Sequence, residues 1–302
     1  MRALITGCEG FLGANLAKEL IAQGVEVTGT SLNRQGKTSL EALGVDCRIE
    51  YGDVTDAQFV ERVVSTSEPD WVFHLAAVSI VRVANASPGR TMGVNIQGTV
   101  NVLDACRFFG VGKVLIASSD KAYGDHNGKP YVEDMPLKPT GAYEVSKACA
   151  DMVGQFYNAI VLRCANIYGC GDLNWSRLIP NSCRLALNGE SPRIYGGAVN
   201  AKREWMHVSD AVSAYIHLAN VGLPGAYNVG TGEQSSPLEV AEMITRITGT
   251  KMPGFVEKER EFYEIQEQVL NCDKMHGLGW KSKHSITLGL LETVQWYEDY
   301  LK

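Results

Sequence analysis

The fold class is decided by the first thirteen residues, MRALITGCEGFLG, and the segment that follows them. Arg2–Thr6 has the composition of a short buried strand, an amphipathic helix is predicted from about Leu12 to Gln23, and Val25–Thr30 is a second strand. Between the first strand and the helix stand glycines at GxxGxxG spacing, namely Gly7, Gly10 and Gly13. Such glycines let the backbone approach a pyrophosphate, whose charge is stabilised by the free N–H groups of the helix N-terminus. The segment therefore predicts half of a dinucleotide-binding unit.

The alternation of strand-like and helical runs continues through the first half of the chain. Strand-like runs at Asp46–Tyr51, Trp71–Leu75 and Lys113–Ser118 are separated by helical runs at Asp56–Ser65 and Thr91–Phe109. This order predicts a Rossmann-type, doubly wound α/β fold, in which a parallel sheet carries helices on both faces.

Two regions are predicted. We expect a dinucleotide-binding domain over residues 1–168, completed by part of 203–232, and a smaller C-terminal α/β region over 169–302 that mainly binds the substrate. The second region is broken by Pro and Gly into shorter segments. Its expected elements are helices at Arg177–Leu187, Ser236–Thr248 and Ser285–Tyr300, and a strand at Arg193–Tyr195.

Composition excludes several classes of protein. Acidic residues exceed basic ones by 34 − 28 = 6, which argues against a nucleic-acid partner and against a polybasic membrane patch. The eight cysteines are scattered without a CxxC pair, so we expect reduced thiols and neither disulfides nor a metal site. No apolar run approaches about 18 residues, and the N-terminus runs directly into a strand without a signal peptide. A cytoplasmic location is expected.

The reactive side chains gather in residues 118–147, SSDKAYGDHNGKPYVEDMPLKPTGAYEVSK. The apolar run Lys113–Ala117 delivers hydroxyl, carboxylate and ammonium groups at its C-terminal end. If Tyr143 opens a helix, Lys147 lies one turn further along the same face. An ammonium beside a phenol lowers the pKa of the phenol below its free value of about 10. The stretch therefore predicts a proton-transfer centre.

Polar or small residues also follow other predicted strands. Asp53, the run His74–Ala77 and Ser119 fall at carboxyl ends, where ligands of such sheets bind, and Asn95 lies early in a following helix, where it could tie loops together. For His74 we favour a hydrogen-bonded histidine over a catalytic one. The second strand ends in TSLNR, without the carboxylate that normally holds the adenosine ribose of NAD. Arg34 is either a partner for the 2′-phosphate of NADP or a solvated loop arginine.

Six short motifs are spread along the chain. They are TGxxGFLG at Thr6–Gly13, HLAA at His74–Ala77, YxxxK at Tyr143–Lys147, RxxNxYG at Arg163–Gly169, a match to RDxxHVxD at Arg203–Asp210, and YNxG at Tyr227–Gly230. With them the chain resembles the extended short-chain dehydrogenase/reductase family, over a length that reaches about Trp296. The resemblance implies a nicotinamide cofactor, NAD or NADP, and a nucleotide-diphosphate hexose as substrate.

The run Ser119-Asp120-Lys121 separates subgroups of that family. Nucleotide-sugar 4,6-dehydratases carry a hydroxyl residue and then Asp-Glu at this place, and CDP-glucose 4,6-dehydratases look closest, with Ser-Asp-Lys. The segment Gly171–Pro180 is similar to theirs as well. Sugar 4-epimerases usually have small or apolar residues after the serine. A dehydratase must remove water across C5 and C6, which needs a proton acceptor and a proton donor. A strand-end ion pair in solvent is the structural alternative for the two charged residues.

The resemblance implies a role for each catalytic candidate. Tyr143 would take the proton of the sugar C4 hydroxyl while hydride passes to the nicotinamide, and Ser119 would hydrogen-bond that hydroxyl. Lys147 would lower the Tyr143 pKa and hold the nicotinamide ribose. Asp120 and Lys121 would manage the C5 proton and the departing C6 hydroxyl, with acid and base not assigned between them.

Further residues are expected at the two ligands. The cofactor-binding set is Gly7, Gly10, Phe11, Leu12, Gly13, Arg34, Asp53, Val54, Leu75, Ala76, Ala77, Asn95, Tyr143, Lys147, Cys164 and Asn166. The substrate-binding set is Ser79, Asn166, Arg177, Leu178, Tyr195, Arg203 and Arg260, of which Arg203 could bind the diphosphate bidentately. Arg184 is a further candidate. Trp175, Trp205 and Tyr195 could stack on a base, although such residues more often pack in a core.

Only fifteen residues, 148–162, separate Lys147 from Arg163, so the helix must end near Gly154 or Asn158 and turn at once into a strand. In relatives this helix and the one near Thr99–Phe109 form a four-helix bundle across a dimer, and a homodimer is expected here. A nucleotide-sugar 4,6-dehydratase is the leading interpretation. A 4-epimerase, or a 5,6-dehydratase or reductase, is the alternative, and a non-catalytic dinucleotide sensor is a minor one.

Overall fold

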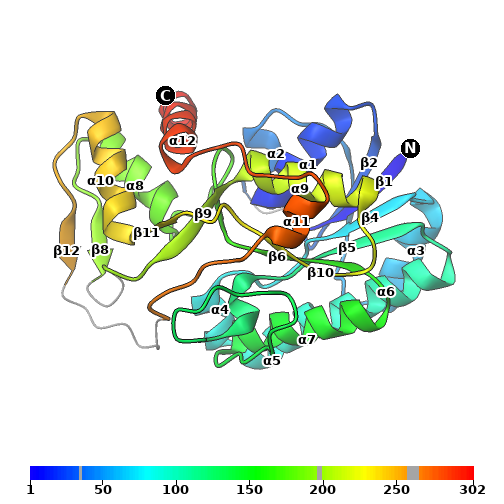
Figure 1. Cartoon of the computed structure of the whole chain (residues 1–302). Helices are drawn as coiled ribbons and strands as arrows, with labels where there is room; N and C mark the ends of the chain where they lie inside the picture. The colour runs from blue at the N-terminus through cyan, green and yellow to red at the C-terminus, as the bar shows by residue number, and fades with distance from the viewer. Residues whose placement is uncertain (34–35, 196–198, 257–264) are drawn as a thin grey trace.

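The computed structural model describes residues 1–33, 36–195, 199–256 and 265–302, and its centre is a seven-stranded parallel sheet (Figure 1). The strands stand in the order β10-β6-β5-β4-β1-β2-β3. Their bounds are β1 Arg2–Thr6, β2 Glu26–Ser31, β3 Arg48–Tyr51, β4 Trp71–His74, β5 Lys113–Ala117, β6 Ile160–Cys164 and β10 Gly225–Val229. Thr6 is in register with Thr30 on β2 and with His74 on β4, so the carboxyl ends of these strands meet at one edge.

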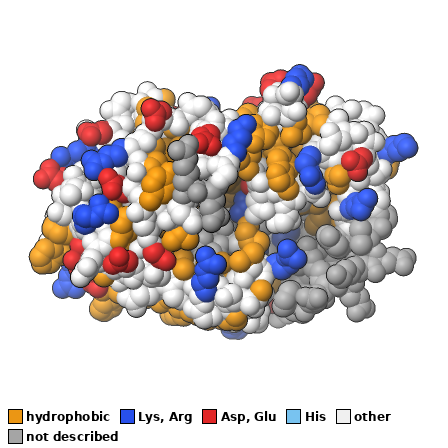
Figure 2. All heavy atoms as spheres, turned by 180° about the vertical axis from the view of Figure 1, so that it is seen from behind, with side chains coloured by type: hydrophobic (Ala, Val, Ile, Leu, Met, Phe, Trp, Pro, Cys, Tyr) orange, Lys and Arg blue, Asp and Glu red, His pale blue; other side chains and the backbone are white. Residues whose placement is uncertain are grey.

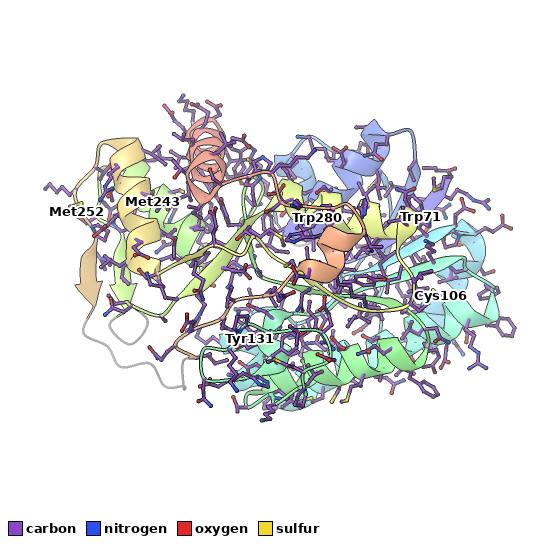
Figure 3. The ribbon with its side chains drawn as sticks, viewed as in Figure 1. Trp71, Cys106, Tyr131, Met243, Met252 and Trp280 are labelled. Carbon is purple, nitrogen blue, oxygen red and sulfur yellow. The ribbon has the colours of Figure 1, made fainter. Side chains whose placement is uncertain are left out.

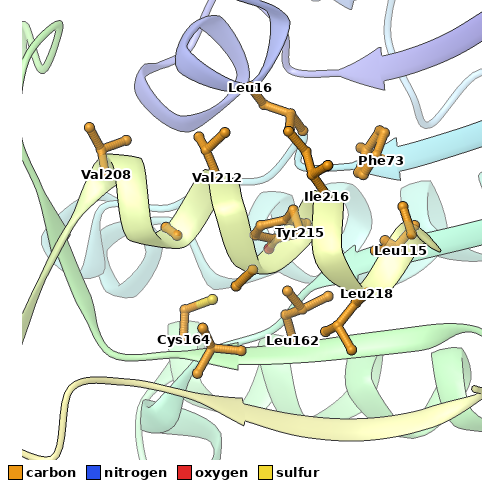
Figure 4. Close-up of a cluster of buried hydrophobic side chains, with 14 of the residues drawn as sticks. Leu16, Phe73, Leu115, Leu162, Cys164, Val208, Val212, Tyr215, Ile216 and Leu218 are labelled. Atoms are coloured by element: carbon orange, nitrogen blue, oxygen red, sulfur yellow. The ribbon is translucent and has the colours of Figure 1, made fainter. Parts of the chain in front are cut away.

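Helices cover both faces of this sheet (Figure 1). On one face α1 (Phe11–Ala22) packs against α9 (Val208–Val221); the other face carries α3 (Ala57–Ser67), α6 (Gly98–Phe108) and α7 (Ala142–Phe156). Figure 4 shows the apolar side of α9, where Val212 and Tyr215 lie between α1 and the sheet. The predicted Rossmann-type fold is confirmed, because a seven-stranded parallel sheet carries helices on both faces.

The rest of the chain forms a smaller layered region beside the carboxyl edge. It holds a three-stranded sheet of β7 (Asn166–Tyr168), β9 (Arg203–His207) and β11 (Gln234–Ser235), and a two-stranded sheet of β8 (Arg193–Tyr195) and β12 (Gly254–Val256). Helices α8 (Leu178–Leu187), α10 (Pro237–Thr248) and α12 (Ile286–Leu301) share a hydrophobic cluster. The short helices are α2 Ser39–Ala42, α4 Val81–Ala86, α5 Pro88–Met92 and α11 Asp273–Gly277, with a 3-10 turn, η2, at Asp120–Tyr123.

Two local features test the expected boundaries. The single helix expected at Thr91–Phe109 is interrupted, because residues Gly93–Gln97 (η1) adopt π-helical geometry between α5 and α6. The abrupt end of α7 is confirmed: the helix stops at Phe156, Asn158 takes a left-handed φ of 58°, and β6 begins at Ile160. A residue in the left-handed region reverses the chain in the shortest distance.

The described surface is mixed in charge. On the face shown in Figure 2, basic and acidic side chains are interspersed with hydrophobic ones. None of the helices in the described ranges is both long enough and apolar enough to span a bilayer.

Candidate active site

The glycine turn between β1 and α1 is a backbone surface held by close contacts. Gly7 has a φ of +71°, and a Cβ placed on it would lie 3.0 Å from the Ala76 backbone. A Cβ on Gly13 would lie 2.8 Å from the Cα of Cys8 and still closer to the Gly7 carbonyl oxygen. Helix α1 begins at Phe11 without a side-chain cap. Its first N–H groups are therefore available to an anion, as the predicted pyrophosphate site requires.

Hydrogen bonds join the loops that follow β1 and β4. The Thr6 hydroxyl oxygen accepts from the N–H groups of Leu75 and Ala76, at 3.1 Å each, and contacts His74 Nδ1 at 2.8 Å. The second ring nitrogen of His74 contacts the Thr99 hydroxyl at 3.0 Å. Burial lowers the pKa of His74 to about 3, aided by the charge of Lys147. His74 is thus the hydrogen-bonded, neutral histidine that the sequence favoured.

Asn95 ties loops together, as expected. Its Oδ1 accepts from the Val78 N–H at 2.7 Å, and its Nδ2 donates to the Ser146 hydroxyl at 2.8 Å. Asn95 lies in the π-helical turn, and Ser146 lies in α7 beside the predicted catalytic lysine. The irregular turn therefore positions an amide that joins the loop after β4 to the helix carrying the reactive groups.

Tyr143 and Lys147 occupy one buried face of α7, as their spacing predicted. The Lys147 ammonium donates to the Ala117 carbonyl oxygen at the end of β5, at 2.7 Å. Burial lowers the pKa of Lys147 to about 8.

The expected lowering of the Tyr143 pKa is wrong, because the pKa lies above its free value of about 10. Burial raises the pKa of Tyr143 to about 12, against a hydrogen bond with Ser119 and the charge of Arg177, which act in the other direction. The charge of Asp120 adds to the rise. The cost of removing the phenolate from water outweighs these two contributions, so the net shift of the Tyr143 pKa is upward.

Ser119, Asp120 and Lys121 lie together where β5 ends. The Ser119 hydroxyl donates to Asp120 Oδ1 at 3.0 Å, and the Lys121 Nζ lies 3.5 Å from the same oxygen. Lys121 also donates to the Asn166 Oδ1 at 2.9 Å. Asp120 is only 2% exposed, so the pair is not the solvated ion pair that the sequence left as an alternative.

Arg177 connects the glycine turn with the smaller region. Its Nη1 is 3.0 Å from Asp172 Oδ2, and its guanidinium lies over the Phe11 ring, 5.9 Å from the centroid. The charge of Arg177 also opposes the rise in the pKa of Tyr143. A partly exposed guanidinium with this placement can contact a ligand that lies between the two regions.

Arg203 and its neighbour Glu204 are both buried at the start of β9. Arg203 donates to the Lys202 carbonyl oxygen at 2.9 Å. Glu204, which replaces the aspartate of the family motif, accepts from the N–H groups of Thr231, Gly232 and Leu270. Burial raises the pKa of Glu204 to about 7, against these hydrogen bonds. Sequence reasoning missed Glu204, although its departure from the motif was visible.

Tyr131 was also missed. It stacks on Tyr123 with ring centroids 4.7 Å apart, and its hydroxyl donates to the Gly124 carbonyl oxygen. Figure 3 labels it near the junction of the two regions. Burial raises its pKa, and the charges of Asp120 and Arg203 both act on it, which places it close to these groups. A lone tyrosine in a loop carries no pattern that singles it out.

The other predicted ligand residues divide into three groups. Asp53 accepts from the Thr55 N–H, Val54 is buried against α6, and Cys164 is buried at the end of β6. Ser79 is exposed, and Leu178 packs at the start of α8. Arg34, Arg260 and the Tyr195 side chain lie outside the described residues.

Two tryptophans that could stack on a base have packing partners in the structure. Trp175 packs on Tyr297, and the Arg184 guanidinium lies 5.5 Å from the centroid of the Trp175 ring. Trp205 donates its Nε1 to the Ser235 carbonyl oxygen. These are packing contacts, the commoner outcome that the sequence predicted.

A parallel sheet, a glycine turn and a serine, tyrosine and lysine at its carboxyl edge define a dinucleotide-binding protein of the short-chain dehydrogenase/reductase class. The family model described as the NAD dependent epimerase/dehydratase family matches residues 3–230. The chain belongs to this family, whose members are enzymes, and the predicted family is confirmed.

Individual relatives cover nearly the whole chain. The dTDP-glucose 4,6-dehydratase of Mycolicibacterium smegmatis is 30% identical over 313 residues, which cover 98% of this chain and 93% of that protein. The structure of UDP-glucose 4-epimerase from Thermotoga maritima with UDP-glucose has a TM-score of 0.92 and 26% identity, and covers all of both chains. The dTDP-glucose 4,6-dehydratase DesIV from Streptomyces venezuelae, with NAD and TYD bound, has a TM-score of 0.90 and 27% identity, covering 99% and 97%. The family and the NAD-bound DesIV structure support NAD as the cofactor.

Proposed function

We propose that this protein is a nucleotide-sugar 4,6-dehydratase that converts a nucleoside-diphosphate hexose into its 4-keto-6-deoxy derivative. The observation that carries the proposal is the buried Asp120 carboxylate, which accepts a hydrogen bond from Ser119 and is paired with Lys121. An epimerase moves one hydride away from and back to the same carbon, and needs no additional acid or base. Elimination of water needs both a proton acceptor and a proton donor, and the two charged residues supply them.

The residues of this chain fit an NAD cofactor, and each has a separate role in binding or proton transfer. Bound NAD supplies a hydride acceptor for C4 and later a donor for C6. The glycine turn and the N-terminus of α1 bind its pyrophosphate, because the glycines present backbone and the helix start has no side-chain cap. Tyr143 accepts the C4 hydroxyl proton, and Ser119 orients that hydroxyl. Lys147, fixed by the Ala117 carbonyl, holds positive charge near the phenol and binds the ribose.

The 4-keto group acidifies the C5 proton, which makes the second half of the reaction a proton-transfer problem. Asp120 and Lys121 accept that proton and protonate the departing C6 hydroxyl. Asn166 holds the Lys121 ammonium from the side of β7, so the pair has a fixed geometry. Arg177 and Arg203 are proposed to bind the diphosphate, and the ligand sets predicted from the sequence are retained as part of this proposal.

The activity is tested with a panel of dTDP-, CDP-, GDP- and UDP-hexoses, followed by NMR of the products. We expect a 4-keto-6-deoxy sugar from one nucleotide series, and no product from Tyr143→Phe. Interconversion of C4 epimers without a keto product contradicts the proposal. Binding of NAD without turnover across the panel supports a sensor instead.

Asp120→Asn tests the residue that carries the proposal. We expect oxidation at C4 to continue and elimination to slow by about 10²–10⁴-fold, so that reduced nicotinamide accumulates in a single turnover. The matched control is Asp134→Asn, which changes an exposed carboxylate in the same loop and should leave both steps unchanged. An equal loss of both steps in Asp120→Asn contradicts a role in elimination.

A 4-epimerase is the second candidate, and the structural similarity to the Thermotoga maritima epimerase favours it. The difference lies at Asp120 and Lys121, which epimerase chemistry does not use. The resemblance of the motifs to those of CDP-glucose 4,6-dehydratases stays a prediction. The relative described above is a dTDP-glucose 4,6-dehydratase.

A homodimer is proposed on the outer side of α6 and α7. Phe108 is 81% and Phe156 78% exposed, and Met152 adds another exposed apolar side chain. Such large exposed apolar side chains on adjacent helices favour a second copy as the partner. Light scattering should give a dimer for the wild type and a monomer for Phe108→Glu with Phe156→Glu. A monomeric wild type contradicts this part of the proposal.

A further inference from the structure

Two thiols meet behind the glycine turn. The Sγ atoms of Cys8 and Cys47 lie 4.0 Å apart, and both cysteines are free. Cys8 is part of the turn itself, directly after Gly7, whereas Cys47 immediately precedes β3. The two residues are 39 positions apart in the sequence, so no local spacing pattern reveals their contact.

The two thiols differ in freedom to move. Cys8 has no exposed surface, and a Cβ on Gly29 of β2 would lie 2.7 Å from its Sγ. Its N–H donates to the Thr30 carbonyl oxygen at 3.0 Å. Cys47 is only partly buried and leads into β3, the last strand of the sheet, which has a single neighbour. Closer approach of the sulfurs therefore comes mainly from the side of Cys47.

The thiols also differ in acidity. The hydrogen bond with Cys8 lowers the pKa of Cys47, whereas the same contact, together with burial, raises the pKa of Cys8. A partly exposed thiol with a lowered pKa is the one that reacts with oxidants, and a buried neighbour can then resolve the product.

We propose that Cys8 and Cys47 form a reversible disulfide when the protein meets a hydroperoxide, and that this disulfide weakens dinucleotide binding at the glycine turn. The Cys47 thiolate attacks the outer peroxide oxygen, the O–O bond breaks, and the remaining oxygen leaves as water after protonation. The Cys8 thiol then attacks the sulfur of the Cys47 sulfenic acid, and the hydroxyl leaves as water with the thiol proton. Two thiols and one hydrogen peroxide thus give one disulfide and two waters.

The effect on the cofactor follows from the packing of the turn. A disulfide requires the sulfurs to approach to about 2.05 Å, and so to close a gap of about 2 Å. A Cβ on Gly13 would lie 2.8 Å from the Cα of Cys8, and one on Gly7 would lie 3.0 Å from the Ala76 backbone, so the turn has little room to move. The part of the approach that Cys47 does not supply falls on Cys8, and any displacement of Cys8 moves the adjoining N–H groups that we assign to the pyrophosphate. This step rests on the glycine turn as the cofactor site and is independent of the proposed dehydratase activity.

The test compares the wild type with Cys47→Ser and with the matched control Cys149→Ser, which removes another partly exposed thiol. Each protein, with its bound NAD, is treated with hydrogen peroxide and then with dithiothreitol. Peptide mass mapping locates crosslinks, and gel filtration measures the NAD retained. We expect a Cys8–Cys47 crosslink and NAD dissociation about tenfold faster in the wild type and in Cys149→Ser, restored by reduction.

Cys47→Ser should keep its NAD under the same treatment, and Cys47→Ala serves if the serine variant folds poorly. Oxidation of other cysteines without a Cys8–Cys47 crosslink overturns the proposal. A crosslink that leaves NAD retention unchanged overturns its regulatory part.

Discussion

The two regions of this molecule are held in place by different means. The cofactor side of the sheet is fixed mainly by backbone: parallel registers align Thr6 with its neighbours, and Gly7 and Gly13 allow contacts that no side chain would permit. The smaller region depends on buried carboxylates that reach across the sequence. Asp210 accepts from the N–H groups of residues 283 and 284, and Glu204 accepts from that of Leu270.

This difference explains which region can change its ligand specificity by substitution. A backbone surface that binds a pyrophosphate tolerates little variation, because each glycine is required by a close contact. In a region held together by single carboxylates, a substitution in one loop disrupts only the hydrogen bonds of one carboxylate. Within the dinucleotide-binding region itself, Arg163 of β6 and Asp151 of α7 form a buried bidentate ion pair.

The largest effect on stability is expected at that buried ion pair. Arg163→Ala leaves Asp151 buried without its partner and should lower the free energy of unfolding by about 3–5 kcal/mol. Arg48→Ala is the control, because Arg48 pairs with Glu50 on the surface and should contribute about 0–1 kcal/mol. Urea denaturation measures both. Equal effects of the two variants would contradict the stabilising role of the buried pair.

The next largest effect is expected in the glycine turn. Gly13→Ala places a methyl group against Cys8 and the Gly7 carbonyl, which should cost about 1–3 kcal/mol and abolish NAD retention. Gly89→Ala, where a Cβ meets no atom within 4 Å, should bind NAD as the wild type does. Retention measured after gel filtration checks both. A Gly13→Ala protein with normal NAD content would contradict the claim that the glycine turn tolerates no side chain at this position.

A smaller effect is expected from pH. The pKa of His74 is depressed in the folded protein, to about 3, so its contribution to stability is present above the unfolded value of about 6.5 and is lost as pH falls toward 3. Stability should therefore fall by up to about 1.4 kcal/mol per pH unit for this one proton. His74→Asn should remove that part of the slope, and His276→Asn, at an exposed site, should not. Unfolding curves measured between about pH 7 and about pH 4 give the slope of stability against pH. Identical slopes for the wild type and His74→Asn would contradict a neutral, buried His74.

The smallest effect on stability is expected at Glu204. Glu204→Gln replaces one acceptor oxygen by a donor and should cost about 1 kcal/mol. Because residues 231, 232 and 270 lose part of their anchor, KM for the sugar nucleotide should rise while NAD retention stays unchanged. Glu298→Gln, on the surface of α12, is the control. Loss of NAD in Glu204→Gln would contradict the claim that Glu204 supports the smaller region without affecting cofactor binding.

The same contrast decides what the sequence could predict. The sheet, the glycine turn and the face of α7 followed from local spacing, because strand alternation and the YxxxK separation are periodic signals. The roles of Glu204 and Tyr131 did not, because their partners lie far along the chain. The pKa of Tyr143 was predicted in the wrong direction, since spacing shows the nearby ammonium but not the burial of the phenol. Burial of Asp120 likewise required the fold.

The central claim, elimination after oxidation, is tested most directly by following the hydrogen from C4. The wild-type enzyme is given nucleotide sugars with deuterium at C4, in unlabelled water, and the product is examined by NMR. A dehydratase transfers the label to C6 of a 4-keto-6-deoxy sugar, and this is the result we predict. Deuterium that remains at C4, distributed between two epimers, would contradict the account.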